Sequence, residues 1–504
     1  MKKYFLFLIA AIGIMMASCS REDDGPVTPT PSPEISISQA MIDSIYQAIF
    51  DKNNVAKYNE ISSELVSPVE MANRIYGPEG ANGDEDVANA RKAFMDNCNR
   101  VSDSIANKLG QNGFALNFRT HKFNYVTVDE NNQPLTLSAF MCWACYRDDE
   151  EKIMDQNHIV FVCPYTHTKW NECATESDGG MERKTMACDN LFIIPDGQGF
   201  GVNRGAPQTY LAHHLHAQQY YDCLVAADRI FREKGGKFKS QWGLRVVGAS
   251  QGGGDALSLH KYLETHDYEY DLTPYYNSND ENDKKIADEI CKKAGVAAGT
   301  KTFKKPLKDQ WRLAYSYVAV GPYNPEATLK EYLRWGKLSL PCVLPMVLKT
   351  MLAIHPELAA KYNEEDFYSD IYRKHKGEFD KVILEKTLTT SEFTDLMRKN
   401  LAYDNESKKD LEKMPLDRVL SKQMLDTNSD MCKDIMAALR QEDLTSGWTP
   451  TVKCYMYTYD GDEVVPYKNS ELLEKFLGKW ADVESSWFAT SHEMACTFFF
   501  LKKW

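Results

Sequence analysis

The chain has 504 residues, of which 43% are hydrophobic, and 72 acidic residues against 59 Lys and Arg give a net charge of −13. Because phosphate contacts require clustered Lys and Arg, and no basic helix or nucleic-acid motif is present, nucleic acid is excluded as an expected partner. The hydrophobic fraction is sufficient to bury a substantial core, so we expect a globular protein.

The amino terminus has the pattern of an export signal. Met1-Lys2-Lys3 is basic, and the apolar run from Tyr4 to Met16 is too short to be a stable membrane span. The small residues before Cys19 resemble the cleavage box of bacterial lipoproteins. This resemblance implies a signal peptide over residues 1–18 and lipidation of Cys19. A plain secretory signal that is cut nearby is the alternative.

Residues 19–35 are predicted to form a tether. The acidic segment 20–24 resembles the surface-export signal of lipoproteins in Bacteroidetes-type bacteria, and four prolines between residues 25 and 33 favour an extended spacer. The resemblance implies an outer-membrane lipoprotein that is held by its lipid anchor alone and exposed at the cell surface. A periplasmic or secreted protein is the alternative.

Residues 36–115 are predicted to form a helical extension. Ile42, Ile45, Tyr46 and Ile49 are spaced like one face of a helix, and the Gly- and Asp-rich segment 77–86 separates two helical pieces. From Phe123 onward the apolar pattern alternates, and a polar turn at residues 129–132 predicts a β-hairpin.

Residues 116–324 are predicted to form the first part of an α/β core. This segment contains, in chain order, an apolar strand at 158–163, a polar loop at 166–190, a helix at 206–234 and strands at 244–248 and 314–320. Alternation of strand and helix implies a mostly parallel central sheet.

The segment Gly248-Ala249-Ser250-Gln251-Gly252 follows one of these strands directly, and apolar positions with helical spacing come after it. It matches G-x-S-x-G, in which a serine is exposed on a sharp strand-to-helix turn and the glycines let two backbones pass closely. We therefore predict that Ser250 is a nucleophile. The alternative is an ordinary Gly-rich turn.

Residues 325–445 are helical in pattern and rich in Leu and Met, and we interpret them as a helical insertion. Their apolar stripe is suited to line an acyl pocket, although ordinary packing against the sheet explains it equally well.

Residues 446–504 are predicted to complete the core. A strand at 453–459 runs into Asp460-Gly461-Asp462, a last short strand is expected at 485–489, and His492 opens a terminal helix. An acidic residue just past a strand can accept the Nδ1 proton of a histidine, and that histidine can then act as a base towards serine. Asp460 and Asp462 are the rivals for the acid, and His492 is the predicted base.

These motifs resemble the α/β-hydrolase superfamily, and more narrowly its secretory lipase and esterase group. The spacing of Asp462 to Val464-Val465-Pro466 resembles the acid loop of many α/β-hydrolases, which favours Asp462 over Asp460. The chain order Ser, Asp, His fits the same family. Two further segments are similar: Pro195-Asp196-x-x-Gly199-x-Gly201 and His492-x-x-Ala495.

The resemblance implies a triad of Ser250, Asp462 and His492. The first oxyanion donor would be the backbone N–H of Gln251, and the second would come from His167 or its neighbours. Thr168 stands where these enzymes often have glycine. The resemblance also implies that residues 325–445 form a cap or lid.

The implied function is that of a serine hydrolase, which cleaves carboxylic esters through an acyl-enzyme and requires no cofactor or metal. A peptidase or amidase and a carbohydrate deacetylase are alternatives on the same fold. A non-catalytic binding protein that retains the hydrolase shell is an alternative of another class.

Other cysteines and histidines are interpreted as structural. Cys142 and Cys145 have a C-x-x-C spacing, but no second such pair completes a zinc site. Cys173 and Cys188 flank one loop and are the single disulfide that we expect. His213, His214 and His216 fall in a helical region where at most two share a face, so no metal site is predicted.

Overall fold

The computed structural model describes residues 57–80, 85–109, 116–147, 152–404, 406 and 409–501, together with residues 38, 42, 45, 46 and 49. The predicted signal peptide 1–18, Cys19 and the tether 19–35 lie outside these described residues. The chain divides into two units, one made of residues 1–48 and 271–301 and the other of residues 49–270 and 302–504.

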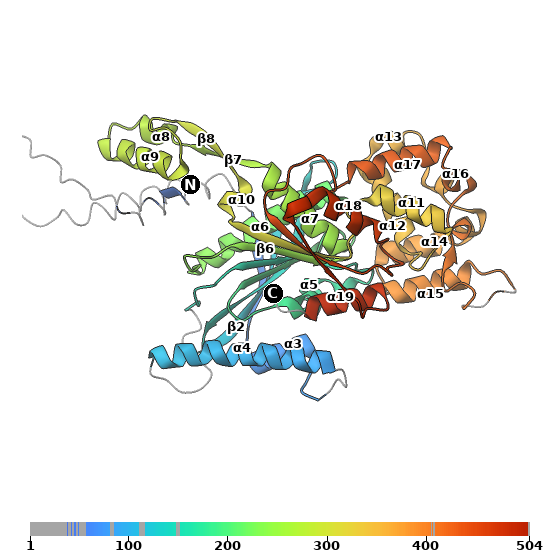
Figure 1. Cartoon of the computed structure of the whole chain (residues 1–504), viewed down its shortest axis with the longest axis horizontal. Helices are drawn as coiled ribbons and strands as arrows, with labels where there is room; N and C mark the ends of the chain where they lie inside the picture. Colours follow the sequence, from blue (N-terminus) through green and yellow to red (C-terminus); the bar gives the residue numbers. More distant parts are fainter. Residues whose placement is uncertain are drawn as a thin grey trace, which may run out of the picture. The chain divides into compact units, whose positions relative to one another are not determined.

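The larger unit is built on a nine-stranded sheet with the order β1-β2-β3-β5-β4-β6-β9-β12-β13 (Figure 1). Its strands are β1 (Tyr58–Val66), β2 (Leu116–Val128), β3 (Pro134–Tyr146), β4 (Ile159–Val162), β5 (Leu191–Pro195), β6 (Leu244–Ala249), β9 (Leu313–Ala319), β12 (Lys453–Thr458) and β13 (Ala481–Ser485). The pairs from β1 to β5 are antiparallel, and all pairs from β5 to β13 are parallel. The sheet is therefore mostly parallel, as predicted.

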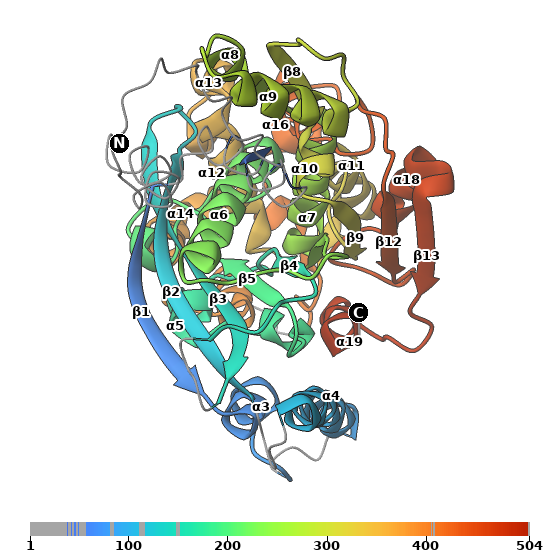
Figure 2. The same cartoon turned by 90° about the vertical axis from the view of Figure 1, so that its left-hand side faces the viewer.

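Helices cover both faces of this sheet. Figure 2 shows α6 (His213–Glu233) and α7 (Gln251–Thr265) on one face, and α3 (Pro68–Tyr76), α4 (Glu85–Leu109) and α19 (His492–Leu501) on the other. Strands β4 and β5 are buried along their whole length, since a strand covered on both faces reads as a continuous apolar run. Alternate residues of β6 face α19, where Val247 and Ala249 share a core with Phe499.

Residues 58–66 form strand β1, so the prediction of helix throughout 36–115 is wrong for this segment. β1 is an edge strand with mostly exposed side chains, and it is held by antiparallel pairing with β2. A polar edge strand carries little hydrophobic periodicity, which is why the sequence did not reveal it. The described residues 42, 45, 46 and 49 are helical, and α3 and α4 lie on either side of the predicted Gly- and Asp-rich break.

The structure differs from the sequence-based prediction at the boundaries of one helix and one strand. The helix expected at 206–234 begins only at His213, because Leu211 has a positive φ of 63° that interrupts helical geometry. The strand expected at 485–489 ends at Ser485, which pairs with Thr458, the last residue of β12. The Ser486 N–H still donates to the carbonyl of Thr458 at 2.7 Å, and the residues after it form the loop that leads to His492.

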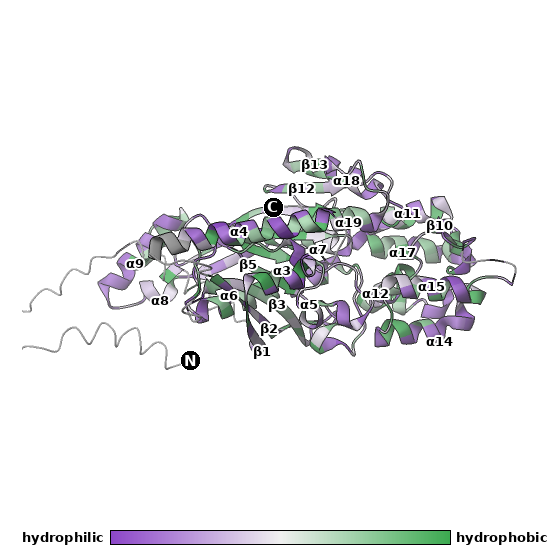
Figure 3. Ribbon diagram, turned by 90° about the horizontal axis from the view of Figure 1, so that it is seen from below, coloured by the Kyte–Doolittle hydropathy of each residue, from purple (hydrophilic) through white to green (hydrophobic). Residues whose placement is uncertain are grey.

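Residues 325–441 form a mainly helical insertion between β9 and β12, grouped at one end of the sheet (Figure 1). Its elements are α11 (Pro325–Trp335), β10 (Lys337–Leu338), α12 (Val343–Ile354), α13 (Pro356–Ala359), η5 (Glu364–Phe367), α14 (Asp370–Glu385), α15 (Thr390–Asn400), β11 (Met414–Pro415), η6 (Leu416–Arg418), α16 (Lys422–Leu425) and α17 (Asp430–Gln441). The insertion has its own hydrophobic core. Figure 3 shows α12 as mainly hydrophobic, whereas hydrophilic residues colour much of α14. We call this insertion the cap.

Shorter elements complete the two units. The larger unit also contains η2 (Trp170–Glu172), α5 (Ala174–Ser177), η3 (Glu182–Thr185), η4 (Gly201–Asn203), α10 (Leu307–Gln310), α18 (Lys468–Leu477) and η7 (Gly478–Trp480). Strands β7 (Asp267–Asp271) and β8 (Thr302–Pro306) pair with each other. The smaller unit has α8 (Thr273–Tyr276) and α9 (Glu281–Ala294). No helix in the described part of the chain combines the length and the apolar character that a bilayer crossing requires.

The cysteines that the structure describes are all unpaired and buried. The predicted disulfide between Cys173 and Cys188 is therefore wrong. The Cys173 thiol donates to the carbonyl of Trp170 at 3.3 Å, while the Cys188 thiol lies beside that of Cys98 on α4. Proximity along the loop did not bring the two side chains together, because each turns towards a different partner.

Candidate active site

Ser250 lies on the turn between β6 and α7. Its φ of 55° and ψ of −125° are rare for a residue with a side chain, so the turn is locally strained. A Cβ at Gly248 would lie 1.9 Å from the carbonyl oxygen of Gly252, and a Cβ at Gly252 would lie 2.6 Å from that of Cys163. The two glycines are thus required because backbones approach closely, and the strained turn projects Ser250 beyond the strand.

A chain of hydrogen bonds joins the three residues of the predicted triad. Nε2 of His492 is 2.8 Å from Oγ of Ser250, and Nδ1 of His492 is 2.6 Å from Oδ2 of Asp462. All three residues are buried, with 3–4% of their surface exposed. The structure therefore brings together side chains that lie 242 and 30 residues apart in the sequence.

The structure places Asp462, and not Asp460, against His492. The other carboxylate oxygen of Asp462 accepts the N–H groups of Val464 and Val465, both at 2.8 Å. Those bonds fix the rotation of the carboxylate. Asp460 lies in the same turn but is exposed.

Asp462 controls the protonation of His492. Burial by itself opposes a charged imidazole, but the negative charge of Asp462, the neighbouring Cys496 thiol group and the hydrogen bonds of both outweigh burial and raise the pKa of His492 well above its usual value of 6.5. Because the carboxylate can only accept, Nδ1 carries the proton, and Nε2 of the neutral ring is left as a hydrogen-bond acceptor facing the Ser250 hydroxyl.

The predicted oxyanion donors lie beside one another. Gln251 opens α7, so its N–H has no partner within the helix, and Gln251 and His167 line one small cavity. The N–H of Tyr165 donates to Glu182 at 2.6 Å, and those of Thr168 and Lys169 donate to Glu172 at 3.1 and 2.8 Å. These bonds leave Thr166 and His167 as the candidates for the second donor in this loop.

Two glutamates that the sequence analysis missed hold this loop. Glu182 is 1% exposed, and one of its carboxylate oxygens lies 3.3 Å from Nε2 of His167. Burial opposes the charge of both side chains, but their mutual attraction prevails, so the pKa of His167 is raised and that of Glu182 is lowered. No local sequence motif predicts the pair of His167 and Glu182, because the two residues lie in separate turns of a polar loop.

Thr168, which stands where glycine was expected, joins the loop to the cap. Its hydroxyl lies 3.0 Å from the carbonyl oxygen of Leu388, to which it donates, and 3.3 Å from the hydroxyl of Thr390. The threonine is therefore explained by a contact that spans about 220 residues of sequence.

Lys386 forms a second link between cap and core. Its ammonium donates to the carbonyl oxygens of Arg204, Ala206 and Leu384 at 3.0–3.2 Å, and its own carbonyl accepts the N–H of Trp170. Burial, and after it the charge of Arg204, lower the pKa of Lys386 to about 8. We refer to Thr168 and Lys386 together as the cap tether.

An apolar cavity of about 50 Å³ lies beside Ser250. Its walls come from the loops at Tyr210-Leu211 and Val464-Val465 and from the cap. The cap contributes, among others, Leu329, Val343, Val347, Leu420, Ile435 and Leu439. A cavity of this size holds a few water molecules, so in this conformation the cap leaves room for a short apolar group only.

The three histidines that were considered as metal ligands contact two acidic residues, Glu442 and Asp255. His213 Nδ1 lies 2.9 Å from the carbonyl of Glu442, His214 Nδ1 lies 2.6 Å from the Glu442 carboxylate, and His216 Nδ1 lies 2.8 Å from Asp255. Within the described residues, no group of three His, Cys, Asp or Glu side chains is arranged to hold a metal ion.

Solved structures resemble this chain over most of its length, although no family model and no curated protein sequence matches it. A ligand-bound form of LipA from Xanthomonas oryzae, a rice cell wall degrading esterase, has a TM-score of 0.56 at 13% identity and covers 89% of this chain and 94% of LipA. A candidate hydrolase from Legionella pneumophila has a TM-score of 0.53 at 12% identity and covers 88% and 94% of the two chains. At these identities the likeness concerns the fold alone. The mostly parallel sheet, the serine turn after β6 and these structural matches show that the chain has the α/β-hydrolase fold.

Proposed function

We propose that this protein is a serine hydrolase that cleaves carboxylic esters. The observation that carries the proposal is the continuous hydrogen-bonded chain from Ser250 through His492 to Asp462. A strained serine turn and an adjacent apolar cavity add to it. The esterase activity named for LipA, which has the same fold, supports the same reaction class.

In the proposed mechanism, Nε2 of His492 takes the proton of Ser250 while Oγ attacks the ester carbonyl carbon. The Gln251 N–H and one N–H from Thr166 or His167 stabilise the oxyanion of the tetrahedral intermediate. The intermediate then expels the alcohol, which receives the proton from His492, and an acyl-enzyme remains. His492 next takes a proton from a water molecule while the water oxygen attacks the acyl carbon. The bond from that carbon to Oγ then breaks, His492 returns the proton to Ser250, and the acid is released.

The triad chemistry requires that the serine variant lose turnover. We expect Ser250→Ala to lower kcat for p-nitrophenyl acetate by at least about 10⁴-fold, because the covalent route is removed. Ser240→Ala, at an exposed serine remote from the triad, should keep wild-type turnover and serves as the control. Turnover by Ser250→Ala close to that of wild type would refute the mechanism. Inactivity of the wild type on esters, with cleavage of p-nitroanilides, would favour an amidase.

We also propose that Cys19 carries a lipid anchor that holds the protein at the bacterial outer membrane. The support is the sequence alone: a short signal-like segment, small residues before Cys19 and an acidic, proline-containing tether. We expect the protein expressed in a bacterial host to incorporate labelled palmitate, and Cys19→Ala to abolish incorporation and release the protein from the membrane fraction. Unchanged labelling of Cys19→Ala would show that the lipid is attached elsewhere or that labelling is unspecific.

A further inference from the structure

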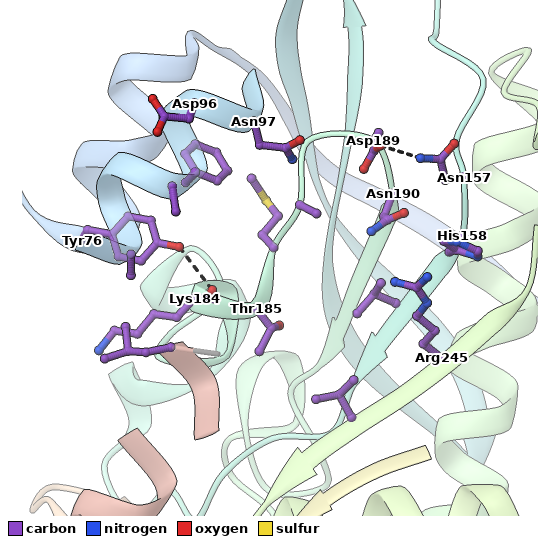
Figure 4. A pocket seen from close by; sticks show the side chains of 18 of the residues that line it. Tyr76, Asp96, Asn97, Asn157, His158, Lys184, Thr185, Asp189, Asn190 and Arg245 are labelled. Atoms are coloured by element: carbon purple, nitrogen blue, oxygen red, sulfur yellow. Dashed lines mark hydrogen bonds between the residues drawn. The ribbon is translucent and has the colours of Figure 1, made fainter. Parts of the chain in front are cut away.

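A second and larger cavity, of about 520 Å³, lies at the other end of the parallel strands from Ser250 (Figure 4). One wall is formed by residues at the amino ends of β4, β5 and β6, and the facing wall is formed by α4. Arg245, on this wall, is five residues before Ser250 on β6, roughly 16 Å along an extended strand. This cavity is therefore separate from the proposed active site.

Hydrogen-bonding side chains face the cavity from both walls. Figure 4 shows Asp96 and Asn97 of α4 on one side, and Asn190, His158 and Arg245 on the other. The Asp189 carboxylate accepts a hydrogen bond from Asn157 within the second wall. Both walls thus carry hydrogen-bond donors and acceptors.

Three side chains of the strand-end wall contain buried polar atoms that lack a hydrogen-bond partner among the described residues. They are Oδ1 of Asn190, Nδ1 of His158 and Nε of Arg245. Asn190 is only 6% exposed. Folded proteins seldom leave such atoms unsatisfied. Solvent does not reach the three atoms in this conformation, so a ligand in the cavity would contact them only when the side chains turn towards it. Rotation of the Asn190 amide about its last torsion can present either its oxygen or its nitrogen to that ligand.

The charges around the cavity argue against a multiply charged ligand. The cations Arg100, Lys184 and Arg245 are nearly balanced by the carboxylates of Asp96 and Asp189. Burial, and then the charge of Arg245, lower the pKa of His158, so its ring is neutral at pH 7 and offers one donor and one acceptor.

Apolar groups form the remainder of the lining. Phe94 belongs to the α4 wall, Val160 and Val247 belong to the strand wall, and Met186 lies in the loop before β5. The Tyr76 hydroxyl, also in the lining, donates to the carbonyl of Lys184. A sugar ring has the complementary surface, since its hydroxyls are both donors and acceptors around the rim and its C–H groups are apolar. The cavity volume falls within the range of small-molecule sites.

We propose that this cavity is a second ligand site, which binds a neutral saccharide of one or two sugar units. The site is distinct from that of the ester-cleaving reaction proposed above, because none of the residues that line it belongs to the triad or to residues 165–169, which carry the candidate second oxyanion donors.

Isothermal titration calorimetry of the full chain carrying Ser250→Ala tests this site without turnover. The probes are glucose, maltose, cellobiose and xylobiose, with glucuronate and inorganic phosphate as charged comparators. We expect at least one neutral saccharide to bind, with a dissociation constant below the millimolar range. Asn190→Leu should weaken binding by at least about tenfold, because it removes the amide while keeping a similar volume.

Asn97→Ala, on the facing wall, should also weaken binding and does not disturb the strand ends, so it keeps the test decisive if Asn190→Leu fails to fold. Both substitutions, made in the wild-type background, should leave ester turnover without saccharide unchanged. Three results would overturn the proposal: no heat from any neutral saccharide at millimolar concentration, binding of phosphate or glucuronate alone, or saccharide binding that survives every folded variant. None of them depends on whether Ser250 is a nucleophile.

Discussion

Ser250 occupies a backbone conformation that an L-residue seldom adopts, and the surrounding residues hold it there. Gly248 and Gly252 permit close contacts that any Cβ would prevent. The Ser250 N–H donates to the carbonyl of Ala319 on β9 at 2.9 Å. The strain is therefore compensated by packing between neighbouring strands, and its consequence is that the Ser250 hydroxyl faces His492 instead of the helix.

At the same scale, Asp462 and Asp460 make a matched pair for testing the electrostatics of His492. Because the base must be neutral, and Asp462 raises the pKa of His492 above 6.5, we expect kcat/KM to fall as the pH drops through this raised pKa. Asp462→Asn should move that midpoint to lower pH and reduce the plateau by about 10⁴-fold. Asp460→Asn should alter neither quantity by more than about twofold. Equal pH profiles for the two variants would contradict the assignment of Asp462.

Among the elements, the loop of residues 165–169, which we call the oxyanion loop because the candidate second oxyanion donors lie in it, is held by carboxylates on one side and by the cap on the other. Glu172 and Glu182 bind its backbone N–H groups, while Thr168 and Lys386 connect it to the cap. Movement of the cap therefore changes the surroundings of the loop. The proposed oxyanion donors, Thr166 or His167, lie in the same loop.

The cap tether can be tested with a nearly isosteric substitution. Thr168→Val removes the hydroxyl and with it the hydrogen bond to the carbonyl of the half-buried Leu388, which should cost about 0.5–1.5 kcal/mol of stability. We expect a lower Tm and a several-fold lower kcat with little change in KM. Thr168→Ser keeps the hydroxyl and should retain wild-type values in both kinetic and thermal-melting measurements. If the valine and serine variants have the same Tm and the same kcat, the Thr168 hydroxyl of the cap tether contributes neither to stability nor to turnover.

At the scale of the whole molecule, catalysis is proposed to take place where the sheet meets the cap. The cavity beside Ser250 is lined by core loops and by α11, α12 and α17, so its size depends on how the cap packs. A larger cavity lies at the opposite end of the same strands. Cavity size alone would have pointed to the wrong end of the sheet for the ester chemistry.

The small volume beside Ser250 predicts the substrate range. With about 50 Å³ available, we expect kcat/KM for p-nitrophenyl esters to be highest for acetyl and butyryl groups and to fall steeply for longer chains. Val347→Ala, which truncates a cap side chain on the cavity wall, should extend activity towards longer chains. The alanine variant at the exposed cap residue Leu384 is the control. Maximal activity on long chains in the wild type would show that the cap opens widely in solution.

The sequence by itself determined the elements whose signals are local. The serine turn, the acid loop and the helix that begins at His492 are each specified by a short segment between a strand and a following helix or turn. The mostly parallel sheet follows from the alternation of these segments. Ser250, Asp462 and His492 were predicted to act together from their order along the chain, and the structure places His492 at hydrogen-bonding distance from both of the others.

Only the tertiary structure decided the features that depend on distant partners. The polar strand β1 exists because β2 pairs with it, and Cys173 and Cys188 remain apart because each thiol turns to a different neighbour. Thr168 and Lys386 connect segments separated by about 180–220 residues. The physical reason is the same in each case: the energy of such a contact belongs to a pair of distant residues, and neither member has a local pattern that reveals the other.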